Sequence, residues 1–300
     1  MRSQKGVQFA KDSENFIREA IGRFVEESPA NIRKVDQGRY FGSPLIGFAS
    51  ASDPLFEQYK EIIGDFHFSP REIFDLTFGR SDDRRELSVI SWILPIAEDT
   101  RKANRKETES PALLWSHTRY FGEPFNVELR SHVVSVLERK GCRAVAPSNS
   151  HHFIHHMHAP GVGFTSNWSE RHVAYTCGLG TFGLCGGFIT PVGKAIRIGT
   201  VVAEVALKLS VRAYTGHHAN CLHYSKGTCK ACARRCPGGA ISGDGRDKDK
   251  CYDYMHATSP PKKAEYGVQI AGCGLCQTKV PCEFEIPRNI QKDDLSGGVL

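Results

Sequence analysis

A cysteine-rich segment constrains this chain more than any other feature of its sequence. Eight of the eleven cysteines lie between residues 221 and 282, among glycine, proline, lysine and aspartate and with little apolar material. Such a segment can hardly build a hydrophobic core of its own, so we expect bound metal to hold it together. Because cytosolic thiols are kept reduced, metal or redox chemistry is a better expectation here than disulfide bonds.

The spacing of these cysteines follows an iron–sulfur pattern. The chain reads Cys221-x7-Cys229-x2-Cys232-x3-Cys236-Pro237, then Cys251, and then Cys273-x2-Cys276-x5-Cys282. A C-x2-C turn brings two thiolates to one cluster, and the Cys-Pro step stops a helix and directs that thiolate to a second cluster. In the bacterial pattern C-x2-C-x2-C-x3-C-P, Lys226 stands at the first position here, and Cys221 is the available substitute.

The crossover of the fourth cysteine divides the eight ligands into two sets. One set is Cys221, Cys229, Cys232 and Cys282, and the other is Cys236, Cys251, Cys273 and Cys276. The alternative is zinc, because paired C-x2-C motifs also form zinc ribbons. A ribbon spaces its pairs by about 15–20 residues, and these pairs lie much farther apart. We therefore predict two [4Fe-4S] clusters.

A glycine-rich stretch upstream has the spelling of a dinucleotide-binding loop, Gly178-Leu179-Gly180-Thr181-Phe182-Gly183. A Rossmann fingerprint follows a strand and opens a helix. Here residues 167–175 read as a capped helical turn, and Gly186-Gly187, Pro191 and Gly193 prevent a helix afterwards. Glu204 lies at the distance of a ribose-binding acid but lacks the surrounding βαβ unit. The sequence therefore disfavours a dinucleotide, and loop glycines with positive φ are the simpler interpretation.

The rest of the chain predicts a mixed domain of about 215 residues, α/β or α+β, because helical and strand periodicities are interspersed. The expected helices are 12–27, with Ser13 as its cap, 54–63 and 125–140. The expected strands are 44–49, 88–94 and 142–146, with broken strands in 186–211, and the charged stretch 98–110 is expected to be a solvated loop.

Bulk composition indicates a soluble protein, with 40% hydrophobic and 24% charged residues. The longest apolar stretch, 88–97, is about half a membrane span and contains Pro95. The N-terminus leads into polar sequence without an export signal, so we expect a cytoplasmic protein. The formal charge is +6, but no run of consecutive Lys or Arg residues is longer than two. Two clusters of roughly −2 each would reduce it to roughly +2, so charge says little about partners.

Residues 169–183 followed by the double-cluster segment resemble the epoxyqueuosine reductase and reductive dehalogenase superfamily. Its members carry an E-R-x-x-A-x-x-A/C-G-L-G-x-x-G stretch ahead of a ferredoxin-like double cluster, and the resemblance covers roughly residues 85–285. It implies an α+β, nitroreductase-like domain over 1–214 that holds cobalamin, usually base-off. A ferredoxin-like module over 215–290 and a C-terminal tail over 291–300 would follow.

The resemblance also implies a reaction. An external donor such as ferredoxin or flavodoxin would pass electrons through both clusters to cobalt, and the corrinoid would cleave a C–O or C–halogen bond of a small molecule. By their match to the family stretch, five residues are assigned to the corrinoid and substrate pocket: Glu170, Arg171, Gly178, Gly180 and Gly183.

The chain departs from the family pattern in ways that leave alternatives open. Epoxyqueuosine reductases carry an aspartate shortly before the E-R pair, whereas residues 164–167 contain no acid. The chain also lacks the helical-repeat extension for tRNA and the export signal of respiratory dehalogenases. An electron-transfer or reactivating protein for a partner's corrinoid or flavin is therefore one alternative. Epoxyqueuosine reduction on tRNA is a second, disfavoured one.

The proton donor has three candidates, His155, His156 and Tyr175. The two histidines belong to a crowded stretch, residues 151–158, whose simplest interpretation is a solvated loop. An imidazole there would suit proton transfer near neutral pH, and a helical conformation would instead pair histidines for metal binding. The three cysteines outside the cluster segment, Cys142, Cys177 and Cys185, are interpreted as small buried hydrophobes.

Overall fold

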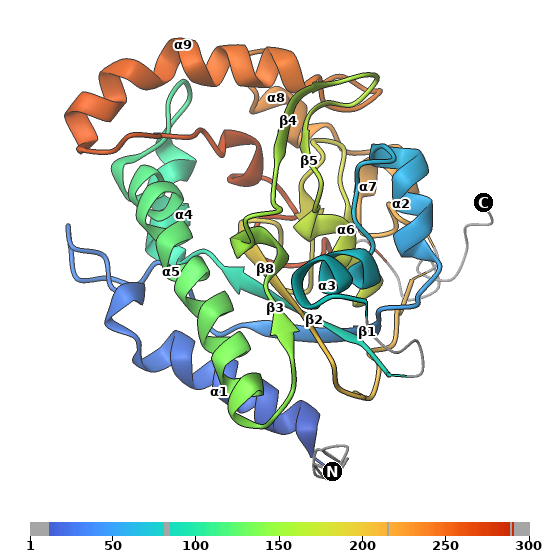
Figure 1. Ribbon diagram of the computed structural model, residues 1–300. Helices are drawn as coiled ribbons and strands as arrows, with labels where there is room; N and C mark the ends of the chain where they lie inside the picture. The colour runs from blue at the N-terminus through green and yellow to red at the C-terminus, as the bar shows by residue number, and fades with distance from the viewer. Residues whose placement is uncertain (1–11, 81–84, 215, 289, 291–300) are drawn as a thin grey trace, which may run out of the picture.

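A four-stranded antiparallel sheet lies at the centre of the structure, a computed structural model that describes residues 12–80, 85–214, 216–288 and 290 (Figure 1). Its strand order is β1-β2-β8-β3. The strands are β1 (Leu45–Ser50), β2 (Ser88–Pro95), β8 (Ile196–Ala203) and β3 (Ala144–Val145). The central strand β2 is buried along almost its whole length, which indicates that both faces of the sheet are covered.

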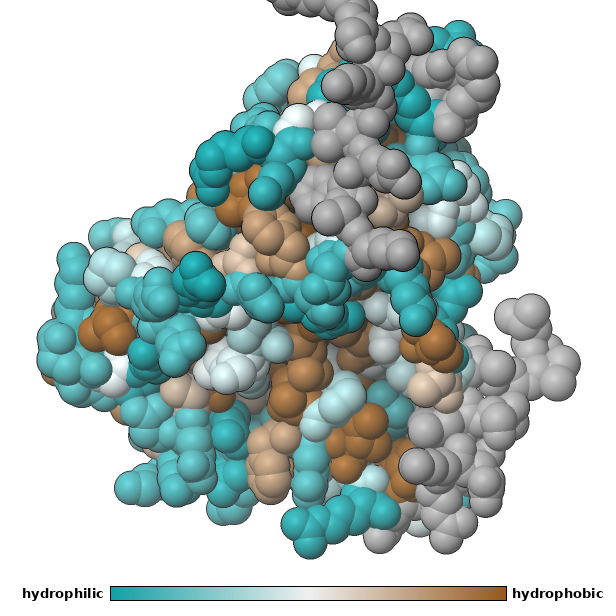
Figure 2. All heavy atoms as spheres, turned by 90° about the horizontal axis from the view of Figure 1, so that it is seen from below, coloured by the Kyte–Doolittle hydropathy of each residue, from teal (hydrophilic) through white to brown (hydrophobic). Residues whose placement is uncertain are grey.

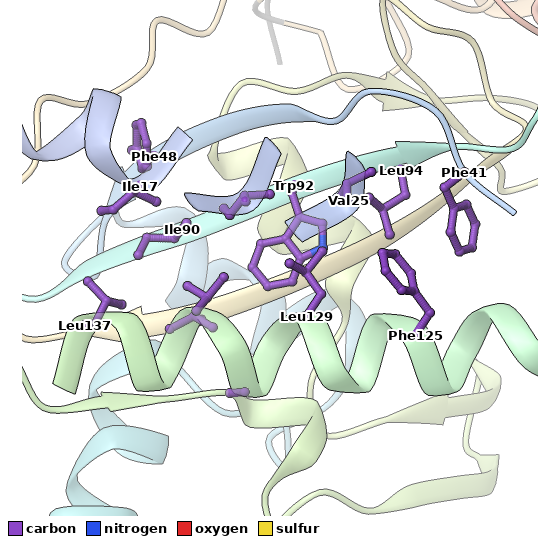
Figure 3. Packing of buried hydrophobic residues seen from close by; sticks show 14 of the residues in the cluster. Ile17, Val25, Phe41, Phe48, Ile90, Trp92, Leu94, Phe125, Leu129 and Leu137 are labelled. Carbon is purple, nitrogen blue, oxygen red and sulfur yellow. The ribbon is translucent and has the colours of Figure 1, made fainter. Parts of the chain in front are cut away.

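One face of the sheet is covered by α1 (Ser13–Glu27) and α5 (Leu113–Arg139), with α4 (Glu98–Lys106) beside α5. Side chains alternate along a strand, and Ile90, Trp92 and Leu94 therefore point to this face. Figure 3 shows them packed against Leu129 and Phe125 of α5 and close to the residues of α1. This cluster forms the larger part of the core between the sheet and these helices.

Three shorter helices cover the opposite face: α2 (Leu55–Ile63), α3 (Pro70–Phe78) and α6 (Glu170–Thr176). Val89 and Ile93, the alternate residues of β2, pack there with residues of all three helices. The result is a sheet between two helical layers. The predicted mixture of helices and strands is confirmed, and the antiparallel sheet makes the class α+β.

Two predicted elements are wrong in their bounds or type. The stretch 98–110 was expected to be a solvated loop, but residues 98–106 form α4, held by buried polar side chains. Thr100 Oγ1 accepts a hydrogen bond from Arg33 at 2.8 Å, and Asn104 Oδ1 accepts one from the Ala112 N–H at 2.9 Å. Helix α5 begins at Leu113, well before the predicted residue 125, and continues through Pro124. Asp12, not Ser13, occupies the cap position of α1.

The remaining elements are short and connect the sheet to the cysteine-rich segment. They are η1 (Pro29–Asn31), η2 (Pro147–Asn149), β4 (His155–Ala159), β5 (Gly163–Ser166), β6 (Thr181–Phe182), β7 (Phe188–Ile189), α7 (Leu222–Lys226), α8 (Ala231–Arg234), α9 (Lys248–Tyr266) and η3 (Leu275–Gln277). The N-terminal end of α9 lies beside the β4–β5 hairpin (Figure 1).

The cysteine-rich segment is tied to the sheet by backbone and charge contacts. The N–H groups of Lys194 and Ala195 donate to the carbonyls of Cys282 and Glu283 at 2.9 and 3.1 Å. The buried Glu283 carboxylate accepts hydrogen bonds from Arg101 at 3.2 Å and from Arg105 at 2.9 Å. The cysteine-rich segment therefore packs against α4 and against the residues that precede β8.

The molecular surface carries hydrophilic side chains over most of the face seen in Figure 2, with hydrophobic ones gathered in separate patches. Among the described residues, no helix has both the length and the apolar character needed to cross a bilayer.

Candidate functional site

The eight cysteines of the C-terminal segment line two different cavities. A small one is lined by Cys221, Cys229, Cys232 and Cys282. A second cavity, of about 440 Å³, is lined by Cys236, Cys251, Cys273 and Cys276. These are the two sets that the crossover of the Cys-Pro cysteine predicts.

Short helices position these thiols. Cys221 precedes α7, Cys232 lies in α8, and Cys236 follows α8 where Pro237 prevents further helix. In the parts of the chain that the structure describes, no three His, Cys, Asp or Glu side chains converge tightly enough for a single metal ion. A four-iron cluster is larger than one ion, and its thiolates stand correspondingly farther apart.

A ninth cysteine lies at the junction of the two sets. Cys185 is 1% exposed, and the ammonium of Lys194, itself 3% exposed, donates to its Sγ at 3.3 Å. Hydrogen bonds with the thiols of Cys232 and Cys276, together with the Lys194 charge, hold the pKa of Cys185 well below its ordinary value. Cys185 is buried as predicted, in a hydrophobic cluster with Leu184 and Ile189, and the Lys194 ammonium is an additional contact that packing alone does not predict.

The other two isolated cysteines behave as predicted. Cys142 and Cys177 are buried in the two hydrophobic clusters that cover the faces of the sheet. Burial raises the pKa of both thiols, which keeps them protonated.

A third cavity, of about 480 Å³, adjoins the 440 Å³ cavity between the sheet and the cysteine-rich segment. Each has the size of a small-molecule site. The residues that line both cavities are Arg119, Ile196, Arg197, Arg246, Cys276 and Gln277. The shared wall places the second cysteine set beside a space large enough for a small ligand.

Glu170 and Arg171, the first residues of α6, both line this third cavity. The Glu170 carboxylate accepts a hydrogen bond from Ser148 at 2.6 Å and lies 3.4 Å from Arg130. Burial raises the pKa of Glu170, against the Arg130 charge and the Ser148 hydrogen bond that favour the carboxylate. Arg171 donates to the Gly186 carbonyl, and burial followed by the Arg246 charge lowers its pKa to about 10.

The glycines of the family stretch lie close to neighbouring parts of the chain. A Cβ at Gly178, whose φ is +73°, would lie 2.8 Å from the Val211 carbonyl, and one at Gly180 would lie 2.4 Å from the Ile189 carbonyl. Neither glycine is among the residues that line the two larger cavities, and Gly183 lines the small cysteine cavity. The absence of a Cβ at Gly178 and Gly180 therefore allows the chain to pack closely against itself.

The three proton-donor candidates lie in different surroundings. His155 is exposed and lines the 480 Å³ cavity, with its ring 5.4 Å from that of Phe164. His156 instead stacks on Phe66 at 3.9 Å. Tyr175 is buried against Tyr214, and burial raises its pKa. The histidines lie on a β-hairpin, which excludes the helical pairing considered for metal binding.

Several charged residues of the cavities were missed by sequence reasoning. Lys194, Arg246 and Lys248 line them but stand in no motif, and no local spacing distinguishes them from surface residues. The fold alone brings them together.

Comparison with known proteins finds likenesses to epoxyqueuosine reductases in structure and in sequence. No family model matches the chain. The solved epoxyqueuosine reductase of Streptococcus thermophilus superposes with a TM-score of 0.50 at 14% identity, over 94% of this chain and 70% of that one. That of Bacillus subtilis gives 0.48 at 16% identity, over 92% and 68%. The first of these likenesses shows a shared fold.

The sequence carries the same resemblance. Over 133 residues the chain is 29% identical to the epoxyqueuosine reductase of Staphylococcus aureus, a stretch that covers 42% of this chain and 32% of that enzyme. The matched part thus spans about a third of the curated relative. The resemblance to the epoxyqueuosine reductase family that the sequence predicts is confirmed.

Proposed function

We propose that this chain is a reductase that carries two [4Fe-4S] clusters and a corrinoid and reduces a small molecule. The observation that carries the proposal is the second cysteine set, which lines a cavity that shares a wall with the adjoining 480 Å³ space. Cys276 lines both cavities, so a cluster held by the second cysteine set would lie directly beside a ligand in the 480 Å³ cavity. The proposal divides the chain into a nitroreductase-like domain, 1–214, and a ferredoxin-like module, 215–290.

The residues present fit the proposed groups. Four thiols at each of two cavities suit two cubane clusters. At the third cavity, Glu170 Oε2 and Arg130 Nε are buried without a hydrogen-bond partner in the described part of the chain, and buried polar atoms need one. The amide side chains of a corrinoid offer both donors and acceptors. Phe188 and Ile198 on the same wall suit its apolar faces.

The clusters would supply single electrons, and a reduced corrinoid would supply the power to break a C–O or C–halogen bond. The chain's own residues would bind the ligand and supply protons. Phe188 and Ile198 form an apolar part of the wall, and His155 is the predicted donor that lines the cavity. Histidine suits this task because its charge changes near neutral pH.

Corrinoid retention by anaerobically reconstituted protein tests the proposal. With hydroxocobalamin present during reconstitution, we expect about one cobalt per chain after gel filtration, since the proposal places a single corrinoid in the 480 Å³ cavity. Glu170→Gln should lower retention, whereas Glu138→Gln, exposed on α5, should not. Protein with full cluster content that retains no corrinoid would contradict the proposal.

An electron-transfer role is a second candidate, favoured by the absence of an acid in β5 and the residue after it, 164–167. It predicts clusters without a retained corrinoid and reduction of a partner's corrinoid or flavin without small-molecule turnover. Protein that turns over a small molecule without any partner would exclude it.

Epoxyqueuosine reduction on tRNA is a third candidate, favoured by the name of the relatives that the chain resembles. A deletion strain would then lose queuosine from its tRNA. Normal queuosine in that strain would exclude this activity.

A further inference from the structure

Three basic side chains converge where the two larger cavities meet. Arg171 comes from α6, Arg246 from the loop before α9, and Lys248 is the first residue of α9. Arg171 lines the 480 Å³ cavity, Lys248 lines the 440 Å³ cavity, and Arg246 lines both. A ligand that spans the shared wall would therefore meet all three cations.

Carboxylates neutralise these three residues little: Asp249 raises the pKa of Lys248, but burial and the two arginines outweigh it. Within the described ranges, none of them forms an ion pair with Asp or Glu, and the sole hydrogen bond of their side chains is the one from Arg171 to the Gly186 carbonyl. Arg130 and Arg197 at the same cavity differ, because both pair with Glu123, at 3.1 and 3.4 Å. Half-buried cations without a partner are uncommon in folded proteins.

The cations also repel one another. Burial and the charges of Arg171 and Arg246 together lower the pKa of Lys248 to about 8, against the charge of Asp249, which raises it. Burial and Arg246 lower that of Arg171 to about 10. Bringing together three like charges costs free energy that a bound anion would offset. The arrangement is thus preorganised for a negative ligand.

A cluster at the second cysteine set would balance part of the charge of Arg246 and Lys248, which both line its cavity, but not that of Arg171. Arg246 interacts with Cys251 of the second cysteine set, so a cluster there would balance part of its charge. Arg171 lines the other cavity, and its bond to the Gly186 carbonyl fixes one guanidinium nitrogen while the remaining donors stay unused among the described residues. Those donors suit a planar or tetrahedral oxyanion, which a guanidinium binds with two parallel hydrogen bonds.

We propose that Arg171, Arg246 and Lys248 bind a carboxylate or phosphate group of the substrate. This inference rests on the proposed function, because it takes the 480 Å³ cavity and the space at its wall with the second cysteine set as the substrate site. It assigns the substrate to anionic small molecules and disfavours neutral ones. The two guanidinium groups orient the oxyanion, and the ammonium adds a point charge from the other side.

Phosphate binding to the anaerobic, cluster-loaded protein tests this assignment. Calorimetric titration with inorganic phosphate should show saturable binding of one ion per chain. Arg246→Gln and Lys248→Gln should each weaken it at least tenfold, and Arg246→Lys less than Arg246→Gln because it keeps the charge. Arg23→Gln, which removes one charge from the exposed side of α1, is the matched control and should bind like the parent. Equal affinity in all variants, or no saturable binding, would overturn the inference.

Two further measurements distinguish this inference from the proposed function and from binding of the cofactor's own phosphate. Iron content and spectra are recorded on the same samples, so loss of clusters with intact phosphate binding overturns the proposed function alone. The second arm repeats the titration with saturating cobalamin and with cobinamide, which lacks the nucleotide phosphate. Binding that persists with both supports a substrate anion. Binding abolished by cobalamin alone gives the site to the cofactor's own phosphate and overturns the substrate assignment.

Discussion

Replacing Gly180 with alanine tests whether the glycine-rich loop serves packing. The added Cβ would lie 2.4 Å from the Ile189 carbonyl and 2.9 Å from the Phe188 ring. The carbonyl cannot retreat freely, because Thr181 and Phe182 of β6 pair with Ile189 and Phe188 of β7. The substitution therefore forces two paired strands apart.

The expected loss of stability follows from this geometry. Overpacking a well-packed site costs about 1–3 kcal/mol, and a clash with paired backbone belongs at the upper end of that range. The entropy gained on replacing glycine returns about 0.4–1 kcal/mol. We expect a net loss of about 2 kcal/mol, which lowers Tm by roughly 4–8 °C for a domain of this size.

Thermal unfolding of the cluster-loaded protein, followed by circular dichroism under anaerobic conditions, measures this loss. Gly22→Ala is the matched control. It adds a methyl group with nothing within 4 Å and should stabilise α1 by up to about 1 kcal/mol. An unchanged Tm for Gly180→Ala together with weaker corrinoid retention would refute the packing argument and restore the loop to the cofactor site.

Three further predictions concern buried charges. Lys194→Met should retain both clusters but shift the midpoint potential of one cluster to more negative values, because a buried cation favours the reduced form. For a one-electron couple, a tenfold change in the equilibrium constant of reduction corresponds to about 59 mV. An EPR-monitored redox titration that shows no shift would contradict this prediction. Glu283→Gln should lower the free energy of unfolding by about 2–3 kcal/mol, because the carboxylate holds Arg101 and Arg105; urea unfolding with an unchanged midpoint would count against it. Burial lowers the pKa of His67 to about 4, below that of the unfolded chain, so the free energy of unfolding should fall as pH drops from 6.5 towards 4, by up to about 1.36 kcal/mol per pH unit. His67→Asn should flatten this dependence, and an identical pH profile in the variant would show that another group causes it.

Local pattern predicts the sheet and part of the helical layers. The continuous apolar run of β2, which is buried along almost its whole length, predicts a strand covered on both faces, and the spacing of Ile17, Ile21 and Val25 predicts the buried side of α1. Helix α4 has no such pattern, because Thr100 and Asn104 are its buried residues. The N-terminal half of α5 contains Gly122 and Pro124, which sequence rules treat as helix breakers, and its contacts with α1 and α4 override them.

The candidate site divides in the same way. Ligand spacing indicates the two cysteine sets because C-x2-C and Cys-Pro are local geometric constraints. Cys185 lies between the two cysteine sets although it is far upstream in the sequence. Arg171 is likewise distant in sequence from Arg246 and Lys248, and only the fold brings them to the same pair of cavities. No short-range signal exists for such contacts, so they follow only from the three-dimensional arrangement.

The central claim is that two four-thiolate sites hold iron–sulfur clusters beside a ligand cavity. Iron and acid-labile sulfide analysis with EPR of the dithionite-reduced, anaerobically purified protein tests it most directly. The account predicts about eight irons per chain and the signals of two neighbouring clusters, with Cys236→Ser abolishing one of them. Stoichiometric zinc, or four irons or fewer after reconstitution, would contradict it.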